Sequence, residues 1–168
     1  MGAPMVVLSP VQRLQPGFAG VAERVLAGTL RHYGRDLISL AVFGSVARGE
    51  ARPDSDLDVM IVARNLPAGR MKRAGQFVAV EAQARTEAAG ILISPVFKTP
   101  EELERGSPLL FDMTEHVALL HDKEGYLANR IAEVRRRLRN LGAHKVRGAQ
   151  GDYWILKEPF TPGEIFDL

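Results

Sequence analysis

Two aspartates, Asp56 and Asp58, stand two positions apart where the apolar run Leu57–Ala63 begins. Side chains alternate across a strand, so positions i and i+2 point to one face, roughly 6–7 Å apart at a rise of ~3.3 Å per residue. Two carboxylates presented in this way can share hard cations, because magnesium prefers a few carboxylates together with phosphate oxygens and water. The flanking Leu57 and Val59 are then expected to face the core.

Gly44 and Ser45 follow an earlier apolar run, Leu37–Phe43. A strand that ends in Gly-Ser and turns into a helix offers free backbone N–H groups and a hydroxyl to a phosphate. Glycine also lets a phosphate approach the backbone closely. Because acid-x-acid follows about ten residues later, phosphate donors would lie opposite metal ligands. Phosphoryl or nucleotidyl transfer needs this combination, in which metals bridge a triphosphate and donors hold the leaving pyrophosphate.

Two other motifs overlap these residues, and both fail at named positions. A calcium-binding loop that begins at Asp54 would need glycine at its sixth position, where Val59 stands. A P-loop that begins at Gly44 would need Lys-Ser/Thr where Glu50 and Ala51 stand.

The string FGSVARGEARPDSDLDVMIV resembles the signature of the DNA-polymerase-β-like nucleotidyltransferase superfamily. It is most similar to the small, minimal nucleotidyltransferases of bacteria and archaea. The later stretches SPLLFDMTEHVALLHDKEGYL and YWILKEPFTPGEIFDL resemble stand-alone members with a C-terminal extension. The resemblance implies that Gly44 and Ser45 hold the triphosphate. It also implies that Asp56 and Asp58 are catalytic and bind Mg²⁺ in a two-metal arrangement.

Arg48, Arg52 and Ser55 lie in the loop between Ser45 and the aspartates. A guanidinium in this loop, Arg48 above all, could neutralise phosphate charge. Ser55 could contact a phosphate or orient Asp56, although a loop serine can instead cap its own turn. We therefore include Arg48 and Ser55 among the predicted nucleotide-binding residues.

Members of the superfamily carry a third carboxylate, which helps to bind the catalytic metal and can take the acceptor's proton. This sequence has no evident counterpart of that carboxylate. The strand that should carry it is Ile91–Phe97, and the aligned position is Ser94. Serine is neither a proton acceptor at neutral pH nor a good magnesium ligand. A glutamate from a neighbouring helix could substitute, and the candidates are Glu81, Glu101 and Glu102.

Strands and helices alternate around these residues. Apolar spacing predicts helices over 18–32, 68–89 and 127–141, the first with Phe18, Val21, Val25 and Leu30 on one face. Strands are expected over 37–43, 57–63, 91–97 and 117–121, with Pro95 assigning the third of them to a sheet edge. Thr99 and Glu102 predict a capping box. The expected fold is α+β, of the nucleotidyltransferase type, with a small mixed β-sheet, helices on one side and a C-terminal extension.

A chain of 168 residues with 46% hydrophobic and 25% charged residues is typical of one globular domain. We predict a single nucleotidyltransferase-type domain over 1–168, with its core over about 18–122 and a C-terminal helix and tail over about 123–168. The absence of cysteine excludes disulfides and thiolate chemistry. No apolar run is long enough for a membrane span, and no signal peptide is recognised, so a cytoplasmic location is expected.

The one basic cluster comprises four arginines of the last predicted helix and three residues beyond it: Arg135, Arg136, Arg137, Arg139, His144, Lys145 and Arg147. It could bind RNA or an acidic partner. It could equally be the solvated face of an amphipathic helix.

The predicted function is magnesium-dependent transfer of a nucleoside monophosphate, AMP from ATP, to a hydroxyl acceptor with release of pyrophosphate. A protein side chain, a small molecule and an RNA end all fit as acceptor. A homodimer or a helical partner protein is compatible with the resemblance. The alternative is a non-catalytic nucleotide-binding or interaction module that has lost the third carboxylate.

Overall fold

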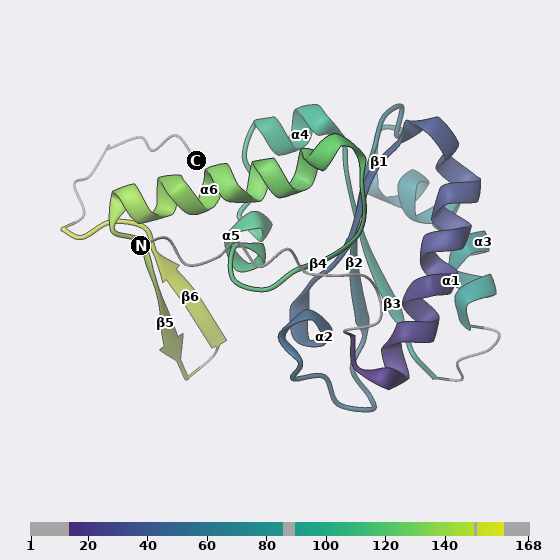
Figure 1. Cartoon of the computed structure of the whole chain (residues 1–168), viewed down its shortest axis with the longest axis horizontal. Coiled ribbons are helices and arrows are strands. Elements are labelled where there is room, and N and C mark those ends of the chain that lie inside the picture. The colour runs from purple at the N-terminus through teal and green to yellow at the C-terminus, as the bar shows by residue number, and fades with distance from the viewer. Residues whose placement is uncertain (1–13, 86–89, 150, 160–168) are drawn as a thin grey trace.

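The computed structural model describes residues 14–85, 90–149 and 151–159. A four-stranded sheet lies at the centre, with helices on both of its faces and a separate hairpin beside the last helix (Figure 1). The expected mixed sheet with a C-terminal extension is therefore observed. The expectation that helices cover only one side is wrong.

The sheet consists of β1 (Leu37–Val42), β2 (Leu57–Ala63), β3 (Ile93–Lys98) and β4 (Ala118–Asp122), in the order β3-β2-β1-β4. β1 runs antiparallel to β2 and to β4, whereas β2 and β3 are parallel. All four predicted strands are confirmed within two residues at each end. Pro95 lies on the edge strand β3 as predicted. An edge strand tolerates a residue without an N–H group, because no other strand pairs with its open side.

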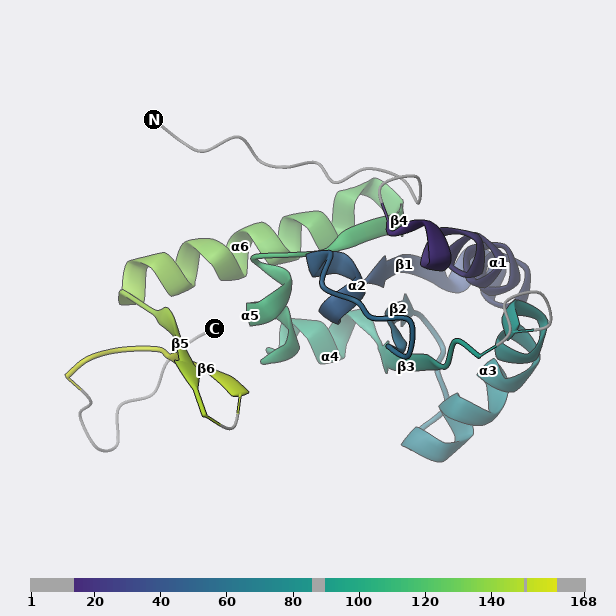
Figure 2. The same cartoon turned by 90° about the horizontal axis from the view of Figure 1, so that it is seen from below.

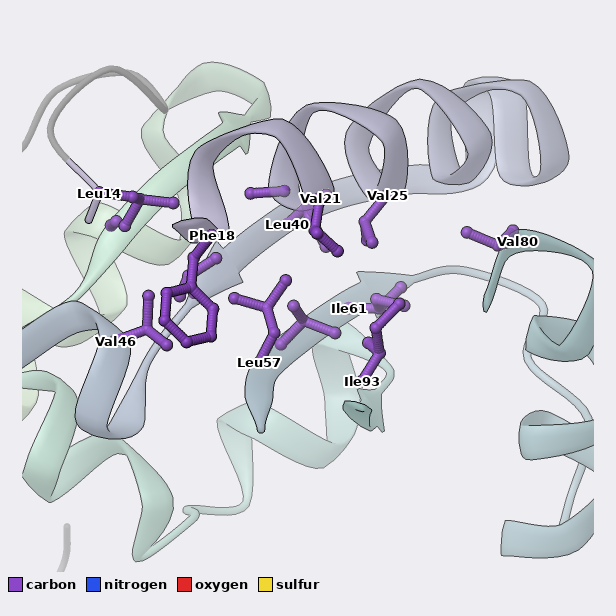
Figure 3. Close-up of a cluster of buried hydrophobic side chains, with 14 of the residues drawn as sticks. Leu14, Phe18, Val21, Val25, Leu40, Val46, Leu57, Ile61, Val80 and Ile93 are labelled. Atoms are coloured by element: carbon purple, nitrogen blue, oxygen red, sulfur yellow. The ribbon is translucent and has the colours of Figure 1, made fainter. Parts of the chain in front are cut away.

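One face of the sheet is covered by α1 (Pro16–Tyr33) and α3 (Arg70–Arg85). Phe18, Val21 and Val25 of α1 are buried against Leu57 and other residues of the sheet (Figure 3). The predicted face of α1 was wrong at its last member, because Leu30 is 39% exposed. Thr29 is buried instead, since each helical residue turns by ~100° and Leu30 falls outside the stripe.

The opposite face is covered by three helices, α4 (Pro100–Glu104), α5 (Leu109–Met113) and α6 (Tyr126–Leu141). Met60 and Val62 of β2 pack on this side, whereas Leu57, Val59 and Ile61 pack on the side of α1. The physical reason for the two covered faces is the composition of the inner strands. Five of the six residues of β1 are apolar, and the sixth, Ser39, donates its hydroxyl to Asp122 Oδ1, so neither face of this strand suits exposure to water and all six residues are buried.

The C-terminal region adds a two-stranded hairpin, β5 (His144–Gly148) and β6 (Gly151–Ile155), after Gly142 ends α6. Two short 3₁₀ turns, Gly34–Asp36 and Lys123–Gly125, connect other elements. Trp154 packs edge-to-face on Phe111 of α5, with ring centroids 6.3 Å apart. The hairpin was not predicted; it lies within the C-terminal helix and tail expected over about 123–168, of which residues 150 and 160–168 lie outside the described residues.

The predicted capping box is present: Thr99 accepts from Glu102 N, and the Glu102 carboxylate accepts from Thr99 N. Arg73 of α3 also donates to both oxygens of that carboxylate at 2.8 Å. These hydrogen bonds lower the pKa of Glu102 from 4.5 to about 2, and the bond from Arg73 has the largest effect. Because the folded pKa lies below the unfolded one, this stabilisation is complete above about pH 4.5 and is lost as pH falls towards 2.

We expect Glu102→Gln to lower the free energy of unfolding at pH 7 by about 1–2 kcal/mol, as for hydrogen bonds to a charged group. Urea unfolding at pH 7 and pH 3 measures the effect, and the variant should lose less stability than the wild type between these values. The control is Glu104→Gln, two residues further along the same helix. Equal loss of stability by Glu102→Gln and the wild type would contradict the prediction.

Candidate active site

Gly44 lies against the side chain of Asp58 where β1 ends and α2 (Gly44–Arg48) begins. Its φ of +69° is a conformation that residues with a side chain rarely adopt. A Cβ atom at this position would stand 3.1 Å from Asp58 Cγ and would overlap the carboxylate oxygen Oδ2. The Phe43 N–H also donates to the Asp58 carbonyl oxygen at 3.1 Å. The glycine therefore brings the backbone at the start of α2 directly onto one carboxylate.

Asp58 is half-buried on β2. Burial, and then the negative charge of Asp56, raises the pKa of Asp58 above its ordinary value, and Arg48 acts against both. Since residues alternate along the strand, Asp58 shares the face of Met60 and Val62, which is the face that α5 and α6 cover. A cation between the carboxylates would offset both the free-energy cost of burying the charged Asp58 and its repulsion from Asp56.

Ser94 of β3 is the residue directly beside Asp58 in the parallel ladder. Its hydroxyl donates to Asp56 Oδ2 at 3.2 Å. The position where the sequence predicted a missing third acid therefore does lie next to the aspartate pair. Across the described ranges 14–85, 90–149 and 151–159, no group of three or more His, Asp or Glu side chains is arranged to hold a metal ion.

The three glutamates considered as substitutes lie elsewhere, so that hypothesis is wrong. α4, with Glu101 and Glu102, follows the far end of β3, six residues and roughly 20 Å of extended chain beyond Ser94. Glu102 is moreover paired with Arg73. Glu81 belongs to α3, which packs on the face of the sheet opposite to Asp58.

Of the predicted nucleotide-binding residues, Arg48 and Ser45 lie on α2 beside the aspartates, whereas the hydroxyl of Ser55 is used within its own turn. Arg48, at the end of α2, donates to Glu50 Oε2 at 2.8 Å and lies close enough to Asp58 to lower its pKa. Ser45 is half-buried in the first turn of α2. Ser55 accepts from the Arg52 N–H at 2.9 Å, so its hydroxyl closes its own turn.

Of the four arginines of α6 in the predicted basic cluster, two contact other groups of the protein and two are exposed. Arg135 donates to the Thr114 carbonyl oxygen, and Arg137 pairs with Glu133. Arg136 and Arg139 are exposed. Two of these four arginines are thus engaged in contacts within the protein, which favours the interpretation of a solvated helix face over that of an RNA site.

A cleft of about 450 Å³ between α2 and the C-terminal hairpin was not anticipated from the sequence. We call it the hairpin cleft; its lining residues are Arg48, Glu50, Glu115, His116, Lys145, Arg147 and Asp152. Lys145 and Arg147 belong to the predicted basic cluster, together with the arginines of α6. The alternation in HKVRG and GDYWI was the available signal for a hairpin with one charged face.

None of the described helices is both long and apolar enough to cross a membrane.

Comparison with known proteins identifies related sequences. The family model described as "Nucleotidyltransferase domain" matches residues 23–115. The curated relative "Putative protein adenylyltransferase MJ1305" of Methanocaldococcus jannaschii is 30% identical over 119 residues, which are 68% of this chain and 79% of the relative.

Solved structures that match this chain include a toxin–antitoxin with AMP-PNP, with a TM-score of 0.48 and 15% identity over 72% of this chain and 92% of that one. They also include the spectinomycin adenyltransferase AAD(9) of Enterococcus faecialis with ATP and spectinomycin. That protein has a TM-score of 0.47 and 14% identity over 71% of this chain and 64% of its own.

Proposed function

This chain belongs to the nucleotidyltransferase domain family and is a transferase of that family, and we propose that it transfers AMP from ATP to a protein hydroxyl. The observation that carries the proposal is the contact of Gly44 with Asp58, which sets a helix N-terminus beside the carboxylate pair. Backbone N–H groups there suit phosphate oxygens. The relative from Methanocaldococcus jannaschii, which is named for protein adenylylation, supports a protein as the acceptor.

The carboxylate pair fits a magnesium ion that arrives with the triphosphate. Asp56 and Asp58 would hold it, and phosphate oxygens and water would complete its shell. Burial, and then the charge of Asp56, raises the pKa of Asp58, and a cation bound beside the carboxylates would offset both effects. When bound, magnesium supplies positive charge that neutralises the reacting phosphates. A second ion would lack the third carboxylate, because Ser94 stands in its place.

The other groups of the site act on the nucleotide. The N–H groups at Gly44 and Ser45 bind the outer phosphates and stabilise the departing pyrophosphate. Arg48 adds a guanidinium at the end of the same helix. Ser94 orients the Asp56 carboxylate through its hydrogen bond. The oxygen of the acceptor hydroxyl attacks the α-phosphorus, the bond to the β-phosphate oxygen breaks, and the hydroxyl proton leaves to solvent or an aspartate.

The test is transfer of label from α-³²P-ATP, with magnesium, to protein acceptors in a nucleotide-free lysate, together with pyrophosphate release by the purified chain. We expect labelled protein bands and stoichiometric pyrophosphate, both abolished by EDTA. ATP that binds in a magnesium-dependent manner without labelling or pyrophosphate would instead favour the non-catalytic nucleotide-binding module. Absence of ATP binding would overturn both functions.

Ser94→Asp is expected to increase the rate of AMP transfer about tenfold or more, by supplying the third carboxylate beside Asp58. It should also lower the magnesium concentration needed for half-maximal rate and slightly destabilise the apo protein through added repulsion. Initial rates across a magnesium titration measure this. The control is Ser94→Asn, which has a similar size and no charge. A rate no higher than that of Ser94→Asn would show that the missing acid does not limit turnover.

A further inference from the structure

The hairpin cleft joins the C-terminal hairpin to the catalytic edge of the sheet. Arg48 lines the cleft at the end of α2, the five-residue helix whose first residue, Gly44, lies against Asp58, so the two places adjoin. The walls come from three separate parts of the chain: the end of α2, the α5–β4 connection and the face of the hairpin. The hairpin lies on the α6 side of the molecule, with the sheet between it and α1 and α3 (Figure 2).

The base of the hairpin is firmly anchored. Trp154 donates to Asp112 Oδ1 at 3.1 Å and stacks edge-to-face on Phe111. Lys145, paired with Trp154 across the hairpin, contacts the same Asp112 oxygen at 2.8 Å. The hydrogen bond to Asp112 raises the pKa of Lys145 above its ordinary value. One wall of the cleft therefore has a fixed position relative to α5.

The charged side chains near the tip of the hairpin do not anchor it to the rest of the protein. Arg147 and Asp152 are register partners on the same face as Lys145 and Trp154, and both are exposed. Within the part of the chain that the structure describes, neither side chain forms a hydrogen bond or ion pair. Arg147 nevertheless lies near enough to Glu50 to lower its pKa. Two opposite charges thus face the end of α2 across the cleft without a structural role.

The lining favours one class of acceptor. All seven residues are ionisable, three basic, three acidic and one histidine. Three acids oppose a nucleic-acid backbone, whose binding depends on neutralised phosphates. Among the described residues, no aromatic or aliphatic side chain lines the cleft to hold a nucleotide base. A polypeptide segment with charges of both signs can pair with both Arg147 and Asp152.

We propose that the hairpin cleft binds the acceptor, that the acceptor is a polypeptide segment with both basic and acidic side chains, and that Arg147 and Asp152 select it. The inference rests on the proposed AMP transfer. The hairpin then holds the acceptor segment beside Arg48, from where its hydroxyl reaches the nucleotide.

The test uses the full chain and four peptides with the same central Tyr and Ser. Their flanks are mixed Lys/Glu, Lys only, Glu only or uncharged Gln, and a single-stranded RNA oligonucleotide and free tyrosine serve as other acceptors. Label from α-³²P-ATP should enter the mixed-charge peptide with the highest kcat/KM. In Arg147→Gln/Asp152→Asn we expect KM for this peptide to rise about tenfold, with kcat and ATP affinity within about twofold of the wild type.

The matched control is Glu23→Gln/Arg31→Gln, which removes one charge of each sign from exposed positions of α1, on the other side of the sheet. It should label the mixed-charge peptide like the wild type. An unchanged KM in the hairpin variant overturns the cleft as the acceptor site. Equal or better labelling of RNA, free tyrosine or another peptide overturns the acceptor class, as does ATP binding without labelling of any peptide. Failure to bind ATP with magnesium overturns the proposed function itself.

Discussion

Asp58→Asn is expected to lower the rate of AMP transfer by about 10²–10³-fold, the scale of losing one charge-stabilising group from an active site. Asparagine has nearly the same shape as aspartate, but its neutral amide is a poor magnesium ligand. Magnesium-dependent ATP binding should weaken in parallel. Initial rates and calorimetric titration with magnesium and ATP measure both effects.

The same substitution should leave the protein as stable as the wild type or more stable. Burial and the charge of Asp56 raise the pKa of Asp58, so the ionised carboxylate costs folding free energy. A neutral side chain removes this cost. Asp54→Asn, in the exposed preceding loop, is the control and should alter neither rate nor stability. Normal transfer by Asp58→Asn would remove Asp58 from the site, whereas a large loss of stability would assign it a structural role.

Gly44→Ala is expected to impair both folding and nucleotide binding. The φ of +69° would strain an alanine, and its Cβ would overlap Asp58. Together these effects should cost about 2–4 kcal/mol of unfolding free energy. The Asp58 carboxylate must also move away from the start of α2, so we expect ATP affinity to fall at least about tenfold. Urea unfolding and ATP titration provide the two measurements.

Gly49→Ala separates the cost of the positive φ from the cost of the overlap with Asp58. Gly49 has nearly the same φ, +73°, but a Cβ there would have no atom within 4 Å among the described residues. It should therefore show only the conformational cost, about 1 kcal/mol, and bind ATP normally. If Gly44→Ala destabilised the protein no more than Gly49→Ala does, the close approach to Asp58 would not matter.

The sequence by itself determined the local features. Continuous apolar runs predicted the strands, and the Thr99–Glu102 capping box is present as predicted. The spacing between Gly44 and Asp58 indicated that a glycine turn and a carboxylate pair belong together. These features depend on residues near one another in the chain, whose backbone preferences and alternation can be read directly.

Tertiary structure alone decided the rest. Which face of β2 carries Asp58 depends on helices packing on both sides of the sheet, and this placement removed Glu81 as a substitute for the third acid. The cation partner of Glu102 is Arg73, 29 residues away in the chain. The hairpin is held near α2 by contacts of Trp154 with Phe111 and of Trp154 and Lys145 with Asp112. Such contacts arise from the burial of surfaces that are distant in sequence, and no local pattern records them.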